Sequence, residues 1–138
     1  MTTSIEDIVK YFNSTLLDFG TSFGELFPKS TIGKNIKEIK LAFKILGNKT
    51  DYIDIFVEKV LIHKDKIDRK DEKFFVDSNY ENETGALKII KEIKGIWTTL
   101  DSSNKNVIWE YMDQLCMMAQ DYFMMNLDKS KKVVTRKE

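Results

Sequence analysis

Both tryptophans of the chain lie in one short segment, on either side of a turn. Trp97 is near the end of one run of helically spaced apolar residues, and Trp109 is near the start of the next. Two helices joined by a short turn pack antiparallel, so the indole rings should lie close together. This predicts a helical hairpin whose tryptophans are core residues, each burying about 150–250 Å². The alternative is an aromatic slot for a ligand.

Apolar residues recur at helical spacing along most of the chain. One proline and six glycines leave few interruptions, and no segment alternates as a strand would. The pattern predicts an all-α bundle of about five amphipathic helices, with a long loop over residues 68–83 between the third and fourth. The expected helices cover about 4–26, 30–47, 50–63, 84–100 and 104–127. Ser4 and Asp7 predict a capping box at the first, and Pro28 its end.

Charge is balanced overall and uneven along the chain. The sequence has 138 residues, enough for one domain with its own core, and 22 basic residues against 22 acidic ones. From Leu127 onward, however, five basic residues stand against two acidic ones. We therefore expect one helical domain over residues 1–127 and a basic, disordered tail over residues 128–138.

Catalytic and metal-binding patterns are lacking. Cys116 is the only cysteine and His63 the only histidine, whereas a zinc site needs about three or four nitrogen or sulfur ligands. A lone cysteine also favours a reducing compartment. The start of the chain, with Glu6 and Asp7, does not read as a secretory signal, and no apolar run is long enough to span a membrane. We expect no catalytic residue, cofactor or metal, and hence no enzyme.

Methionines are concentrated in the last helix. Met112, Met118 and Met125 fit its inward stripe, but Met117 and Met124 lie seven residues apart on another face. Either this helix is buried on all sides, or the second face is an adaptable binding surface. We predict a protein-binding surface made of Met117 and Met124, together with Phe74 and Phe75 in the long loop. The aromatic pair also favours anchoring of this loop on the core. The partner would be another protein or a second copy of the chain, as in a homodimer.

Lysines recur on one side of the second helix. The run consists of Lys34, Lys37, Lys40 and Lys44, of which Lys34, Lys37 and Lys44 could contact the phosphates of a nucleic acid. No aromatic residues interleave with them, and Glu38 interrupts the run. A solvated helix face is therefore the favoured interpretation. The alternative function is a nucleic-acid-associated protein that uses this basic helix face and the basic C-terminal tail.

The tryptophan hairpin also carries a resemblance. Residues 96–111 read Ile-Trp-x-x-Leu-Asp-x-x-Asn-Lys-x-x-Ile-Trp-x-Tyr, and residues 70–75 read Lys-Asp-Glu-Lys-Phe-Phe. Together they resemble a pattern in uncharacterised small proteins of nucleocytoplasmic large DNA viruses, over the C-terminal half only. The resemblance implies a viral source but no activity. We thus expect a non-enzymatic interaction module, virion-associated or host-directed, in the cytoplasm or elsewhere inside the host cell, with no membrane and no small-molecule substrate.

Overall fold

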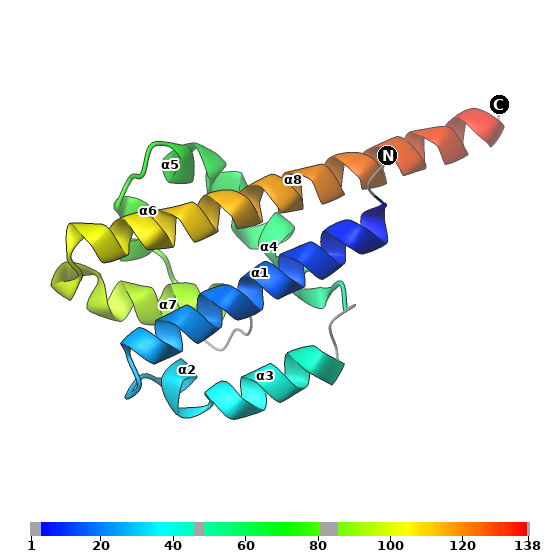
Figure 1. Cartoon of the computed structure of the whole chain (residues 1–138). Helices are drawn as coiled ribbons and strands as arrows, with labels where there is room; N and C mark the ends of the chain where they lie inside the picture. The colour runs from blue at the N-terminus through cyan, green and yellow to red at the C-terminus, as the bar shows by residue number, and fades with distance from the viewer. Residues whose placement is uncertain (1–3, 46–48, 81–85, 138) are drawn as a thin grey trace.

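The computed structural model describes residues 4–45, 49–80 and 86–137, with side chains up to Lys129. Over this part of the chain it contains helices and no strand, so the all-α prediction is confirmed (Figure 1). The α-helices are α1 (Ile5–Leu26), α2 (Thr31–Lys34), α3 (Ile36–Ile45), α4 (Asp51–Lys59), α5 (Lys64–Asp68), α6 (Lys73–Val76), α7 (Ala86–Ile96) and α8 (Ser102–Lys137). Single 3-10 turns follow α4 (Leu61–His63) and α7 (Trp97–Thr99). Among the described residues, no helix is both long and apolar enough to cross a bilayer.

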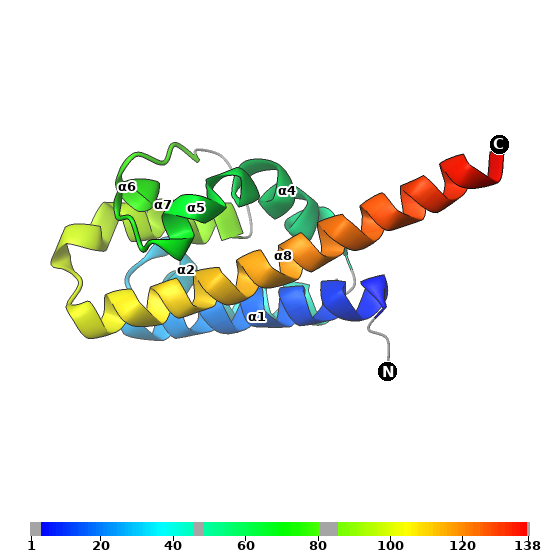
Figure 2. The same cartoon turned by 90° about the horizontal axis from the view of Figure 1, so that it is seen from above.

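Helix α1 runs through the middle of the molecule. Helix α8 lies antiparallel along one side of it, and α2 and α3 lie along the other (Figure 1). Seen from above, α4 to α7 cover the back of the α1–α8 pair (Figure 2). The largest helix–helix contact is therefore between elements nearly a whole chain length apart. The core lies between that pair and the shorter helices.

The ends of α1 follow from local chemistry. Ser4 Oγ accepts a hydrogen bond from Asp7 N at 3.1 Å, and Asp7 accepts one from Ser4 N at 3.5 Å, which is the predicted capping box. The apolar residues spaced three and four apart are buried on one face of the helix. The helix passes Gly20 without ending and stops at Leu26, two residues before Pro28, which cannot continue a helix.

The predicted second helix is two helices. The break falls at Asn35, whose side-chain amide donates a hydrogen bond to Thr31 O at 2.8 Å. An asparagine side chain that bonds to the backbone offers it an alternative to the helical ladder, which explains the interruption. Beyond it, α3 has half-buried residues but no fully buried one, so it is the most loosely packed of the long helices. The end predicted for this helix, at residues 47–48, lies outside the described residues.

Helix α2 is held by close backbone packing and by a distant cap. A Cβ on Gly33 would lie 2.8 Å from Pro28 Cα, so only glycine fits there. Glu92 of α7 accepts hydrogen bonds from the N–H groups of Thr31 at 2.8 Å and Ile32 at 3.2 Å. A carboxylate at a helix N-terminus satisfies unpaired donors and opposes the helix dipole favourably. Helix α7 thereby ties α2 to the bundle.

The two tryptophans meet as predicted, and an additional aromatic pair joins them. Trp97 and Trp109 are buried, with ring centroids 5.6 Å apart and edge to face. Phe75 stacks on Trp97 at 4.6 Å and lies 5.0 Å from Trp109. Phe74 contacts Phe75 at 5.0 Å. We call these four residues the aromatic cluster; it connects α6, the turn after α7, and the start of α8.

Helix α8 continues to Lys137, through the segment for which the sequence predicts a disordered tail. The disorder of this segment in isolation stays a prediction. Lysine and arginine are good helix formers, and a helix that is already nucleated adds residues at little cost. At 1.5 Å per residue, the 36 residues of α8 span about 54 Å and the 22 residues of α1 about 33 Å. The end of α8 accordingly projects beyond the bundle (Figure 1).

The aromatic cluster should dominate stability. Replacing Trp97 by Ala should lower the free energy of unfolding by about 3–5 kcal/mol, because it removes a buried indole and leaves a cavity beside Phe75. Urea unfolding followed by circular dichroism measures this loss. Trp97→Phe keeps an aromatic ring against Phe75 and should lower the free energy of unfolding by less than Trp97→Ala does. An unchanged stability in Trp97→Ala would mean that the indole lines a slot instead of filling the core.

Candidate interaction surfaces

Helix α8 carries an exposed apolar surface. Met117 is 59% exposed and Met124 50% exposed, and Phe123 and Leu127 are 42% and 39% exposed. Met124 is seven residues after Met117, and Leu127 is three and four residues after Met124 and Phe123, so the four positions share one side of the helix, with Gln120 among them. We call Met117, Phe123, Met124 and Leu127 the α8 strip. The prediction that Met117 and Met124 lie outside the inward stripe is confirmed, since Met112 is buried and Met118 and Met125 pack against the core.

Part of the α8 strip continues the row of α8 residues that is buried in the core. Trp109, Met112, Cys116 and Ala119 are buried at spacings of three and four. Phe123 and Leu127 continue the same spacing but are exposed. The last turns of α8 run on beyond the shorter helices (Figure 2). The apolar pattern is thus longer than the surface that the bundle can cover.

Polar and aromatic contacts fix how α8 lies on the bundle. Tyr111 shares a hydrogen bond with Ser22 at 3.1 Å, and its ring stacks on Phe19 at 4.8 Å. Further along, Tyr122 Oη donates to Asp54 Oδ1 at 2.7 Å. Burial and the bond to Asp54 raise the pKa of Tyr122 to about 12, so the phenol stays protonated as a donor. These contacts set the rotation of α8, and therefore the side on which the α8 strip emerges.

Phe74 and Phe75 require a correction. We predicted that they join Met117 and Met124 on a partner-binding surface, but they are 3% and 0% exposed. Helix α6 turns both rings inward against the tryptophans. A pair of adjacent phenylalanines in a polar segment is too costly to leave in water when an aromatic core is within reach. They anchor the segment and do not contact a partner.

The predicted lysines divide between two helices. Lys34 ends α2, while Lys37 and Lys44 lie on α3, and all three side chains are exposed. The break at Asn35 separates Lys34 from the other two. Lys44, however, lines a cleft between α3 and α1 that also includes Lys10 and Lys40. The position of Lys10 beside α3 could not be predicted from the sequence, because the approach of α1 to α3 is a tertiary feature.

Cys116 and His63 form no visible reactive pair. Cys116 is buried, and burial, followed by the charges of Asp113 and Asp68, raises the pKa of its thiol to about 12. A thiol of this kind is protonated at neutral pH and is a poor nucleophile. His63 is half-buried, with its ring edge to face with Phe74 at 5.9 Å. Within the described part of the chain, no three histidine, cysteine or acidic residues are placed to hold a metal ion.

The chain was also compared with known proteins. No model of a protein family, no curated protein and no solved structure matches it.

Proposed function

We propose that this protein is a non-enzymatic protein–protein interaction module whose binding surface is the α8 strip. The observation that carries the proposal is the exposure of four large apolar residues on one side of a single helix. Exposed apolar residues that are scattered singly are normal, whereas a contiguous strip marks an interaction site. Methionine, which supplies half of the strip, adapts its shape to a partner. The viral affiliation implied by the sequence resemblance is part of this proposal.

The partner that fits best is a second copy of the chain. Between Ser102 and Asp128, α8 carries one lysine against four acidic residues, whereas residues 129–137 carry five basic residues and no acidic one. In an antiparallel pair of α8 helices, the basic end of each copy lies along the acidic part of the other. Such complementary charge favours that orientation over the parallel one. A two-fold pair would also cover both α8 strips at once.

Placing charge in the α8 strip should break the association. The double variant Met117→Lys/Met124→Lys should raise the dimer dissociation constant by at least about tenfold, because two ammonium groups would have to lose water at the interface. Sedimentation equilibrium over a range of protein concentrations measures the constant, and circular dichroism checks that helicity is unchanged. Ile62→Lys, at an exposed apolar position on another element, is the matched control and should associate normally.

Two results would contradict the proposal. Unfolding of the Met117/Met124 variant would show that these side chains belong to the core. A wild-type chain that remains monomeric at the highest measurable concentration would rule out the second copy as partner.

The charge pattern makes a separate prediction. Reversing charge at the basic end with Lys131→Glu/Lys132→Glu should weaken association a few-fold, up to about tenfold, because the end would then repel the acidic part of the other α8. The difference in dissociation constant between the variant and the wild type should shrink at high salt, because salt screens the attraction in the wild type and the repulsion in the variant. Sedimentation equilibrium at two salt concentrations tests it. Unchanged or tighter association would exclude the antiparallel arrangement.

A further inference from the structure

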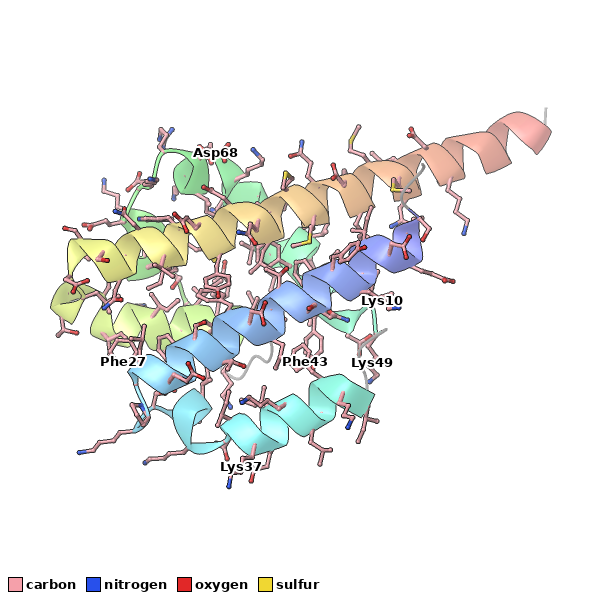
Figure 3. All side chains as sticks on the ribbon, in the orientation of Figure 1. Lys10, Phe27, Lys37, Phe43, Lys49 and Asp68 are labelled. Atoms are coloured by element: carbon pink, nitrogen blue, oxygen red, sulfur yellow. The ribbon has the colours of Figure 1, made fainter. Side chains whose placement is uncertain are left out.

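A cleft of about 410 Å³ lies between α1 and α3. Its volume is in the range of small-molecule sites, about 300–1,000 Å³. Figure 3 shows Lys10 on α1 and Phe43 on α3 at the same end of this helix pair. The cleft exists because α3 buries no residue completely and so leaves room along α1. Its lining consists of Lys10, Asn13, Ser14, Leu17, Lys40, Phe43, Lys44 and Ile45.

The charge in the cleft is of one sign. Lys10 comes from α1, Lys40 and Lys44 come from α3, and no carboxylate is among the lining residues. Among the described residues, none of these three lysines makes an ion pair or a hydrogen bond. Cationic groups around a hollow with apolar walls repel one another and focus their field into it. The arrangement is therefore suited to an anion.

The remaining walls are mainly apolar. Leu17, Phe43 and Ile45 face the cleft, and Phe43 also borders a second pocket of about 220 Å³ on the side of α7. The ring of Phe43 is held by stacking on Tyr52 at 5.1 Å. A bare inorganic anion would leave these apolar walls in contact with water. An anion that carries an apolar group would cover them.

We infer that the α1–α3 cleft binds a small organic anion, a carboxylate or phosphate monoester joined to an apolar group. The ammonium groups of Lys10, Lys40 and Lys44 bind the charged head, and Leu17 and Phe43 contact the apolar part. Charge-assisted hydrogen bonds from lysine to such oxygens are among the stronger polar contacts. The inference is independent of the α8 strip, which lies on the other side of α1 (Figure 1).

A nucleic acid is a poorer fit to the same charges. Lys34 and Lys37 do not line the cleft, so only Lys44 of the predicted phosphate-contacting set faces it. Outside the basic C-terminal segment the chain is net acidic, which opposes a long polyanion. A concave site with apolar walls also favours a compact ligand over an extended backbone.

The test is a titration of the full chain with each of several probes. Binding is monitored through the amide resonances of the labelled protein and by calorimetry. The probes are octyl phosphate, octanoate, inorganic phosphate, octanol and a short oligothymidylate. We expect saturable one-to-one binding of octyl phosphate or octanoate, with shifts confined to residues 10–17 and 40–45. The tighter of the two identifies the preferred head group. Inorganic phosphate and octanol should each bind at least about tenfold more weakly, because each supplies half of the contacts.

Two variants on one helix complete the test. Lys40→Gln/Lys44→Gln removes two ammonium groups from the cleft and should weaken binding by roughly tenfold or more. Lys37→Gln removes an exposed lysine of α3 outside the cleft and should have no effect. Equal binding by both variants, or shifts that map to α8, would overturn the inference. So would oligothymidylate binding more tightly than the octyl compounds and depending on Lys37, since that result would assign this face to nucleic acid.

Discussion

The packing of Phe75 between the two tryptophans is the contact on which the rest of the structure depends. Phe75 lies within 5.0 Å of both indole rings, although the three residues come from three different elements. This places the polar segment that contains α6 against the hairpin, and it fixes where α8 begins. Lys105 adds a polar cover, with its ammonium group 5.0 Å from the Trp97 ring and 3.1 Å from Glu72. That hydrogen bond to Lys105 holds the pKa of Glu72 below its usual range.

Once the start of α8 is fixed, the length of α1 determines how far α8 extends beyond it. The pairing of Tyr111 with Phe19 and Ser22 sets the antiparallel register. Counting along both helices from this point, α1 reaches its first residue while α8 still has about a quarter of its length to run. Met117 and Met124 are exposed because they lie outside the inward stripe of α8. Leu127, the last residue of the α8 strip, lies near the point where α1 reaches its first residue.

Local signals in the sequence predicted much of the fold but little of its tertiary detail. The capping box at Ser4 and the burial of the tryptophan pair depend on nearby residues, and both are confirmed. The break at Asn35 was missed because asparagine within a helix is common and its backbone bond is a matter of conformation. The cap that Glu92 provides to α2 joins residues sixty positions apart, so no local pattern could reveal it. The burial of Phe74 and Phe75 was misjudged because an aromatic pair can serve a core or a partner equally well.

The candidate surfaces arise from a shared constraint, which is that a small bundle cannot cover every amphipathic helix on all its apolar sides. Helix α1 uses its inner face for the core and for α8, so α3 is left with half-buried contacts and a cleft. On α8, by contrast, the apolar pattern continues beyond the ends of the neighbouring helices. The α1–α3 cleft could not be predicted from the sequence, because Lys10 and Lys44 are brought together only by the packing of α1 against α3. Helix α1 separates the two surfaces, and a ligand at one would influence the other only by moving this helix, which packs against both neighbours along its length.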